Sequence, residues 1–323
     1  MTGRPSLRRL PVRATVFLVL AVLGALIATL GRAFDTDEPS ASHLAWLIDL
    51  AAHWQWVYLP TGLLAAGWLL WRGYRIWPLL ALPALVSAWV STPPTLPLIR
   101  SPEPAAQSLT VASANIHLDT QDLSALYDWA VAERVDVLVL LEVTPAHVAQ
   151  LNTFGDFEYR LIHPDYGPFG VAILSRLPLH AEGIIESTFE TPVLRARVEW
   201  KGRNLALSAA HPMPPLSPAY HQARASMLER EAKWGAAHGL PAILAGDLNA
   251  TPWSNGMRVA AAHGLLRSAA YAPSWPSRLP LLPIDHVLAS PHWSVLERQI
   301  GPDVGSDHRP VLARLAIRET SGN

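Results

Sequence analysis

Polar side chains of the kinds that bind metal ions and transfer protons recur along the last two thirds of the chain. They are Asn115, Glu142, His211, Asp247, Asn249, Asp285, His286, Asp307 and His308. Carboxylate and amide oxygens suit hard cations such as Mg²⁺, and imidazole exchanges protons near neutral pH. Each residue alone also fits a turn or an ion pair, but the whole set indicates one active site.

The segments that carry these side chains alternate between strand and helix patterns. Apolar runs predict strands over 109–116, 135–141, 169–175, 193–200, 204–210, 242–246, 284–289 and 311–317, with helices over 120–134 and 218–238. Continuous apolar strands are typical of sheets covered on both faces. The polar residues fall mostly at strand ends, where ligands bind in such sheets. We therefore expect an α/β domain with its site along one rim.

Seven short motifs in this region occur in an order that resembles one enzyme family. They are 113–115 (SAN), 141–142 (LE), 170–176 (GVAILSR), 210–212 (AHP), 246–249 (GDLN), 283–286 (PIDH) and 305–310 (GSDHRP). The ordered set resembles the endonuclease/exonuclease/phosphatase superfamily, especially its membrane-attached bacterial members, over about residues 109–317. The resemblance implies a four-layer α/β sandwich of two packed mixed β-sheets flanked by helices. It also implies cleavage of phosphate esters with a divalent ion, typically magnesium, with manganese as an alternative.

The resemblance and the residue types together suggest metal and water sites. Glu142 is the best metal-ligand candidate, supported by Asn115 and Asp307, because Mg²⁺ keeps one or two carboxylates and leaves positions for water and phosphate. Asp247 matches the family position that activates the attacking water. Asn249 lies two residues further on, so in an extended segment its side chain points the same way and holds that water or a phosphate oxygen.

The resemblance assigns the histidines to the phosphoryl group. His308 matches the family histidine that donates to a phosphoryl oxygen, and Asp285 would orient its ring and favour its protonated form. His211 matches a second histidine that assists charge on the phosphate or the leaving group. Tyr166 is an expected substrate contact. His286 stands where many relatives have Tyr, and it is expected either to contact the substrate or to support residues that do.

Three uncharged apolar segments, 14–31, 54–71 and 76–92, precede this domain. Each approaches the roughly 20 residues that cross a bilayer, and aromatic residues flank the last two, as at membrane interfaces. A cleaved signal peptide is the alternative for the first segment, and a buried soluble hairpin for the other two. We expect a membrane region over 1–92, a Pro-rich linker over 93–106, the catalytic domain over 107–318 and a tail over 319–323.

Arginine placement predicts the orientation of these spans. The cationic residues of the N-terminal tail and of the hairpin turn are Arg4, Arg8, Arg9, Arg13, Arg72 and Arg75. The loop from 32 to 53 is acidic, and positive loops stay in the cytoplasm. The sequence predicts a multi-pass protein of a bacterial-type inner or plasma membrane, with a cytoplasmic N-terminus and a periplasmic or extracellular catalytic domain.

Composition narrows the function classes. Only 16% of the residues are charged and none is cysteine, which excludes disulfides, thiol nucleophiles and cysteine-ligated zinc. The first 100 residues carry eight arginines and four acids, whereas the remaining 223 carry 17 basic and 22 acidic residues. This acidic balance argues against tight duplex binding, which needs clustered cations.

The leading prediction is a membrane-anchored, metal-dependent phosphodiesterase that works by in-line water attack. A tethered nuclease or a phosphatase of the same family is the alternative, and the substrate is open between lipid head groups, nucleotides and nucleic acid. A non-catalytic phosphate-binding receptor and a zinc hydrolase using His211, His286 and His308 are the other readings. The expected partners are the lipid bilayer and the phosphate ester, and nothing in the sequence points to a protein partner.

Overall fold

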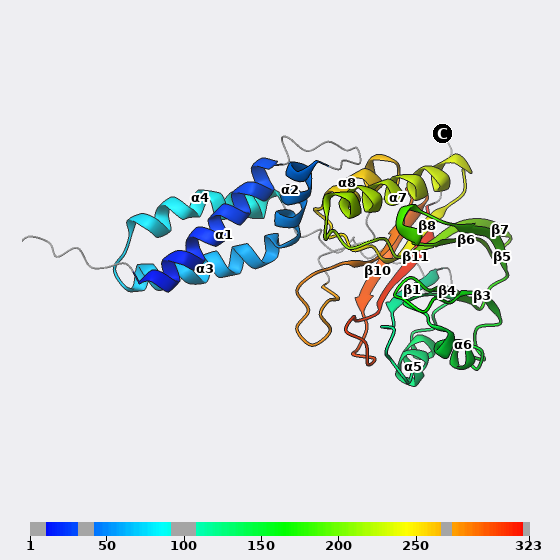
Figure 1. Cartoon of the computed structure of the whole chain (residues 1–323). Coiled ribbons are helices and arrows are strands. Elements are labelled where there is room, and N and C mark those ends of the chain that lie inside the picture. The colour runs from blue at the N-terminus through cyan, green and yellow to red at the C-terminus, as the bar shows by residue number, and fades with distance from the viewer. Residues whose placement is uncertain (1–10, 32–41, 92–107, 266–272, 319–323) are drawn as a thin grey trace, which may run out of the picture. The chain divides into compact units, whose positions relative to one another are not determined.

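The computed structural model describes residues 11–31, 42–91, 108–265 and 273–318. These residues form two compact units, one containing most of the N-terminal helices and the other the strands, and each is described by itself (Figure 1). The predicted linker 93–106 and tail 319–323 lie outside the described residues.

The N-terminal helices are α1 (Val12–Gly31), α2 (His43–His53), α3 (Gln55–Trp71) and α4 (Ile76–Ser91). Three of them, α1, α3 and α4, coincide with the apolar segments found in the sequence. One described stretch, Val12–Leu30, is long and apolar enough to cross a membrane, a property that membrane anchors and signal sequences share. The three-span topology stays a prediction.

Two β-sheets make up the centre of the second unit. One has the strand order β10-β11-β1-β2-β4-β3 and the other β5-β6-β7-β8-β9. The strands of the first are β1 (Leu109–Asn115), β2 (Val137–Leu141), β3 (Tyr159–His163), β4 (Val171–Ser175), β10 (Trp293–Ile300) and β11 (Val311–Ile317). Those of the second are β5 (Leu179–Ile185), β6 (Val193–Trp200), β7 (Arg203–Ala210), β8 (Ala242–Asp247) and β9 (Asp285–Ala289). Both sheets are mixed, because β1 pairs with β2 and β7 with β8 in parallel while the other pairs are antiparallel.

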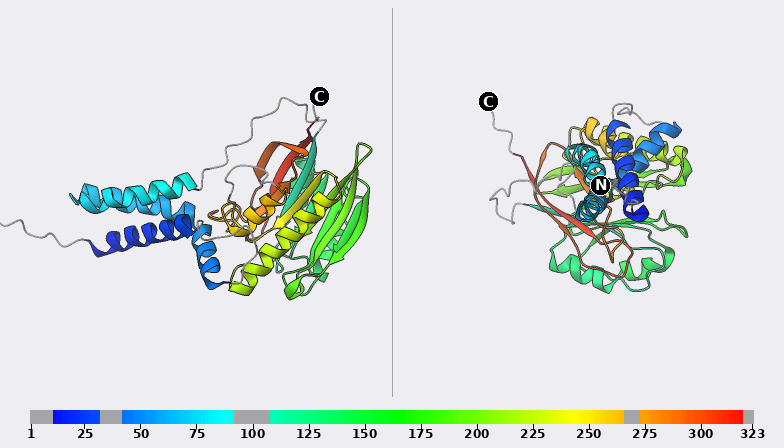
Figure 2. Two further views of the ribbon diagram at one scale, coloured as in Figure 1. Left: turned by 90° about the horizontal axis from the view of Figure 1, so that it is seen from above. Right: turned by 90° about the vertical axis from the view of Figure 1, so that its left-hand side faces the viewer.

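Four helices cover the outer faces of the two sheets (Figures 1 and 2). They are α5 (Ser124–Ala132) and α6 (Pro145–Leu151) on the first sheet, and α7 (Pro218–Ala237) and α8 (Asn255–Ala262) on the second. Alternate residues of the strands form an apolar core between the sheets, which includes Val111, Val139 and Leu207. Opposite residues of the same strands pack under the helices. The expected four-layer α/β sandwich is confirmed.

Strand pairing brings the motif-bearing strand ends together. Asn115 is the last residue of β1 and pairs in register with Leu141, so Glu142 follows directly beside it. In the other sheet, β7 ends just before His211, and Asp247 pairs in register with Asp285 on β9. The rim predicted from the sequence therefore contains residues of both sheets.

The predicted helix over 120–134 is shorter than expected. The helix α5 begins at Ser124, after a turn in which the Asp122 carboxylate accepts a hydrogen bond from the Ser124 amide at 2.9 Å. The chain leaves the helix before Arg134, whose φ of 53° is left-handed. The strands β3, β5 and β10 and the helices α6 and α8 were not predicted, because their apolar residues are few or interrupted.

Candidate active site

The side-chain amide of Asn115 links polar residues of the two sheets at this rim. Its Nδ2 donates to Glu142 Oε1 at 2.8 Å and to Asp247 Oδ2 at 3.3 Å. The first contact stays within one sheet and the second reaches the other. Asn115 has only 1% of its surface exposed, so one buried amide orients two carboxylates toward a shared space.

Glu142 is held at the turn that follows β2. Its φ of 60° is left-handed, an uncommon conformation for a residue other than glycine that marks a constrained position. Its Oε2 accepts a hydrogen bond from the amide of Leu118 at 3.0 Å. The loop after it approaches Gly170 so closely that a Cβ there would lie 1.8 Å from the Val143 carbonyl oxygen. The carboxylate is therefore held by the Asn115 side chain at Oε1 and by the Leu118 backbone amide at Oε2.

Asp247 lies between two imidazoles. Its Oδ2 is 3.5 Å from His211 Nε2 and 3.6 Å from His308 Nε2. Its Oδ1 accepts a hydrogen bond from the backbone amide of Asn249 at 2.9 Å. Asn249 itself is left-handed, with φ of 47°, and its Nδ2 donates to the Pro212 carbonyl at 3.0 Å. The structure thus brings Asp247, Asn249, His211 and His308 together.

Each histidine is oriented by a second acceptor. His211 Nδ1 lies 2.9 Å from the Pro168 carbonyl, and since a carbonyl only accepts, Nδ1 carries a proton. His308 Nδ1 donates to Asp285 Oδ2 at 2.9 Å. Asp285 has no exposed surface. Both Nε2 atoms are consequently directed at Asp247. When Nε2 also carries a proton, the imidazole is positively charged and attracts the Asp247 carboxylate.

Burial and charge act against each other at this cluster. Burial alone lowers the pKa of His308, but the charges of Asp285 and Asp247 outweigh it and raise that pKa to about 10. For His211, the hydrogen bond and charge of Asp247 likewise outweigh burial and raise the pKa. Burial favours the neutral form of Asp247, yet the His308 charge and the His211 hydrogen bond hold its pKa below its usual range. Burial raises the pKa of Asp285, with the His308 charge opposing it.

Two overlapping groups of side chains offer metal ligands. Atoms of Asp247, Asp285 and His308 lie within 4.8 Å of one another. Since His308 has a strongly raised pKa and both its ring nitrogens face carboxylates, it is a hydrogen-bond donor and a poor metal ligand. The carboxylate oxygens of Glu142 suit a divalent cation better. The neighbouring Asn115 directs its Nδ2 at Glu142 and Asp247, and its Oδ1 accepts a hydrogen bond from the His117 amide at 3.0 Å.

Three predicted site residues, described next, make none of the contacts that join Asn115, Glu142, His211, Asp247 and His308. The exposed carboxylate of Asp307 accepts a hydrogen bond from Trp275 Nε1 at 3.1 Å. Tyr166 is 90% exposed in the segment before β4. His286 is wholly buried, and its Nε2 donates to the Ala250 carbonyl at 2.7 Å. The His286 side chain does not reach the surface, so of its two expected roles the structure fits support of the loop after Asp247 and not contact with the substrate.

Three residues outside the predicted set complete the site. The Ser306 hydroxyl donates to the Asn115 carbonyl at 2.7 Å and accepts from the His308 amide at 3.1 Å. The rings of Phe169 and His211 are 5.6 Å apart, and those of Trp275 and His308 are 6.4 Å apart. The sequence could have indicated two of these residues through their position next to motif residues. Ser306 lies two residues before His308, and Phe169 lies one residue before Gly170.

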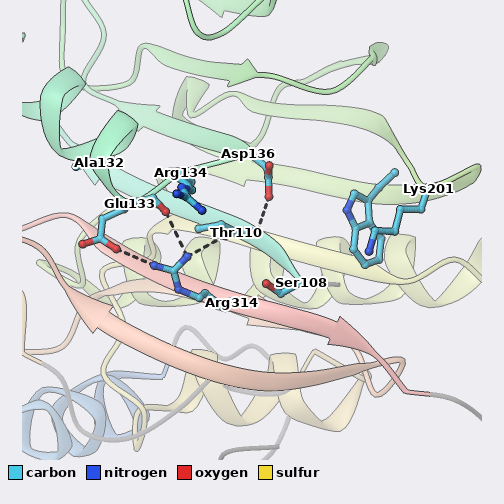
Figure 3. A pocket seen from close by; sticks show the side chains of 9 residues that line it. Ser108, Thr110, Ala132, Glu133, Arg134, Asp136, Lys201 and Arg314 are labelled. Atoms are coloured by element: carbon cyan, nitrogen blue, oxygen red, sulfur yellow. Dashed lines mark hydrogen bonds and ion pairs between the residues drawn. The ribbon is translucent and has the colours of Figure 1, made fainter. Parts of the chain in front are cut away.

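A separate cavity of about 650 Å³ lies at the other end of β1, near Thr110 (Figure 3). Arg314 binds Glu133 at 2.7 Å and Glu297 at 2.9 Å. The Asp136 carboxylate accepts a hydrogen bond from the Thr110 amide at 2.8 Å. The ion pairs join β11 to the end of α5 and to β10, and the Thr110 hydrogen bonds add the start of β1. None of the predicted site residues lines the cavity.

Solved structures with the same fold come from several organisms. A humanised TDP2 from D. rerio is 21% identical, with a TM-score of 0.53, and the match covers 65% of this chain and 99% of that one. The mannosyl-6-phosphatase Bt3783 of Bacteroides thetaiotaomicron is 17% identical, with a TM-score of 0.54 and coverage of 65% and 100%. No curated protein sequence matches the chain.

The family model named Endonuclease/Exonuclease/phosphatase family matches residues 112–308. This range runs from β1 to His308 and so contains every buried polar residue of the cluster. Family membership makes the protein a hydrolase of phosphate ester bonds, a class that uses divalent metal ions. The chain belongs to the Endonuclease/Exonuclease/phosphatase family.

Proposed function

We propose that this protein is a membrane-anchored phosphodiesterase that uses a divalent metal ion and an in-line water nucleophile. The observation that carries the proposal is the position of Asp247. Its Oδ2 is within 3.6 Å of both imidazoles and 3.3 Å from the Asn115 amide that also binds Glu142. The Asp247 carboxylate, two imidazole rings and the hydrogen-bonded pair of Asn115 and Glu142 thus converge on one point.

The donor chemistry around Glu142 and Asn115 fits a hard divalent cation, with Asp307 as a further proposed ligand. Glu142 and Asp307 offer carboxylate oxygens, and Asn115 would ligate through its Oδ1, which accepts a hydrogen bond from the His117 amide. Mg²⁺ in proteins is held by few carboxylates and several waters. Mn²⁺ would suit the same oxygens. When bound, such an ion would polarise the phosphoryl group and offset charge on the leaving oxygen.

The chain's own residues would handle the protons. The lowered pKa keeps Asp247 ionised, so its carboxylate accepts a hydrogen bond from the attacking water and takes the proton as the bond to phosphorus forms and acidifies that water. Asn249 orients the water or a phosphate oxygen. His308, kept protonated beside Asp285, donates a hydrogen bond to a phosphoryl oxygen. His211 faces the same space and stabilises charge on the phosphate or the leaving group, and Tyr166 is a proposed substrate contact on the rim.

The acidic balance of the catalytic domain, 17 basic against 22 acidic residues from 101 onward, favours a small or lipid-borne diester over tightly bound duplex nucleic acid. A tethered nuclease is the second candidate. It is motivated by a D. rerio TDP2 structure with a single-strand DNA product, which has the same fold at 19% identity. Retention of Asn115, Glu142, Asp247 and His308 argues against a non-catalytic receptor.

The membrane part of the proposal rests on the N-terminal helices. Large apolar side chains remain exposed on them, including Leu64 at 76%, Trp71 at 80% and Ile76 at 70%, as expected of lipid-facing surfaces. We propose three spans within 1–92, a linker over 93–106 and a catalytic domain over 107–318 that lies outside the cytoplasm. Alkaline phosphatase fused to the C-terminus should be active. An inactive fusion would indicate that the catalytic domain lies in the cytoplasm instead.

The catalytic proposal is tested with the full-length chain in detergent and bis(4-nitrophenyl) phosphate as substrate. We expect turnover with Mg²⁺ or Mn²⁺, loss of turnover on chelation, and loss in Asp247→Ala and His308→Ala. Asp136→Asn is the matched control, since it removes a carboxylate at the far end of β1. Full activity in both site variants would refute the mechanism. Cleavage of single-stranded DNA at rates above those for the small diester would favour the nuclease.

A further inference from the structure

Arg224 on α7 is a buried cation behind the loop that carries Asp247 and Asn249. It has no exposed surface, and its Nη1 donates to the Asn249 carbonyl oxygen. Its Nη2 is 3.4 Å from Nδ1 of His221, which is also fully buried. A guanidinium is costly to remove from water unless its donors are used, so its position facing an active-site loop calls for a physical reason.

The packing of α8 encloses this side chain. Gly256 on α8 leaves room for it, because a Cβ at that position would lie 3.5 Å from Arg224 Nε and 2.8 Å from Leu228 Cδ1. Both helices cover the outer face of the second sheet (Figure 2). Arg224 is thus sealed beneath two helices and cannot reach a substrate, so any effect on hydrolysis must pass through the loop.

The loop has a backbone that needs external support. Asn249 is left-handed, with φ of 47°, and residues in such regions persist when the surrounding structure over-determines them. On the site side, the Asn249 amide binds Asp247 Oδ1 at 2.9 Å and its Nδ2 binds the Pro212 carbonyl at 3.0 Å. The Asn249 carbonyl is held by Arg224. The two ends of this residue are therefore tied to the catalytic carboxylate and to α7.

The next carbonyl along the loop is held in the same manner. His286 on β9 donates from Nε2 to the Ala250 carbonyl at 2.7 Å, and the Leu248 amide donates to the Ile284 carbonyl at 2.9 Å. Contacts from His286 on β9 and from Ile284 just before that strand fix Ala250 and Leu248, on either side of Asn249. Arg224 then supplies the contact from α7 that fixes the peptide between them.

We propose that Arg224 is a positioning residue for phosphoester hydrolysis. Its guanidinium fixes the carbonyl of Asn249, and the Asn249 amide in turn fixes the Asp247 carboxylate between His211 and His308. This inference rests on the proposed function of Asp247. The guanidinium is a rigid planar fork, whereas a lysine ammonium is a point charge on a flexible stem, so the two are not equivalent at this site.

The test compares Arg224→Met and Arg224→Lys with wild type as full-length chains, by steady-state kinetics with bis(4-nitrophenyl) phosphate and Mg²⁺. A displacement of about 1 Å in a catalytic group costs about 100-fold in rate. We therefore expect kcat of Arg224→Met to fall about 100-fold with KM nearly unchanged. Arg224→Lys should fall between Arg224→Met and wild type. A third variant, Arg224→Ala, tests the chemical group itself. Added guanidinium ion should partly restore its kcat, because the ion can replace the missing donor to the Asn249 carbonyl.

Glu231→Gln on the same helix is the control for lost stability. Glu231 is 1% exposed and binds Arg195 at 2.8 and 3.0 Å and Ser208 at 3.0 Å, none of them in the loop. The Glu231→Gln substitution should lower the temperature of thermal unfolding and leave kcat near the wild-type value. A wild-type kcat in Arg224→Met overturns the inference, as does an equal loss of kcat in Glu231→Gln. If Arg224→Met does not fold, Arg224→Lys decides by the same criterion.

The two levels of proposal fail in different ways. Absence of metal-dependent turnover in wild type, or full activity in Asp247→Ala, contradicts the proposed function whatever Arg224 does. A wild type that is active, an inactive Asp247→Ala and a fully active Arg224→Met contradict only the role of Arg224.

Discussion

Asp285→Asn should make hydrolysis depend on pH in a way that the wild type does not. Asp285 is fully buried, and its Oδ2 accepts the hydrogen bond from His308 Nδ1 at 2.9 Å. The substitution removes the negative charge and keeps the shape of the side chain. The amide oxygen that it introduces still accepts a hydrogen bond, so the imidazole keeps a partner while losing electrostatic support for its charge.

The size of the effect follows from the pKa of His308. Burial lowers it, but the Asp285 charge, followed by that of Asp247, raises it to about 10, so at pH 8 about 99% of the rings are protonated. If the variant ring returned to the ordinary pKa of about 6.5, about 3% would be protonated at that pH. Activity at pH 8 should then fall about 30-fold and recover toward pH 5.5. Because Asp247 still supports the cation, 30-fold is the upper end.

The assay is the dependence of kcat/KM on pH between 5.5 and 9, with the metal ion held at saturation. Asp136→Asn serves as the comparison, since it removes another carboxylate, one that is bonded to the Thr110 amide, and should give a profile parallel to wild type. If the ratio of Asp285→Asn to wild type is constant across the whole range, Asp285 does not set the protonation of His308. A constant large loss would assign Asp285 to ring orientation alone.

Two further predictions test the metal set and the packing of the site. Glu142→Gln should raise the Mg²⁺ concentration for half-maximal activity about 10- to 100-fold, and an unchanged metal titration would exclude Glu142 as a ligand. In Gly246→Ala the new Cβ would lie 1.9 Å from the Ala210 carbonyl oxygen, so β7 and β8 must separate and stability should fall by about 1–3 kcal/mol. A thermal unfolding midpoint equal to wild type would contradict this packing argument.

The strands that position the cluster could be predicted because their residues are apolar on both faces. The apolar run over 135–141 predicted the strand that the structure shows as β2. Glu142 is the polar residue that directly follows this run. The same contrast marked Asp247 after the run over 242–246. A buried strand of a covered sheet leaves a continuous apolar signal. One polar side chain at its end also fits a turn or an ion pair, but the recurrence of such residues at several strand ends indicated a site.

The supporting residues could not be predicted, because their roles depend on contacts between distant segments. Arg224 is an ordinary basic residue of a helix in the sequence, and only the packing of α7 against the loop makes it a buried donor to Asn249. His286 stands in the same motif as Asp285, but alternation along β9 points the two side chains to opposite faces of the sheet. One reaches His308, and the other reaches the Ala250 carbonyl.

The charges that line the site lead us to expect that a divalent ion assists substrate binding as well as turnover. The His308–Asp285 pair is neutral overall wherever the shared proton resides, and so is the pair of His211 with Asp247 when the ring is protonated. Glu142 and the exposed Asp307 add negative charge, whereas Arg224 and Arg298 are bonded to the backbone carbonyls of Asn249 and Asp285. A phosphodiester carries one negative charge, so a divalent cation held by Glu142 would offset the carboxylate nearest to it. We therefore expect substrate affinity, and not only turnover, to depend on the metal, and a KM that does not change with the metal concentration would contradict this reasoning.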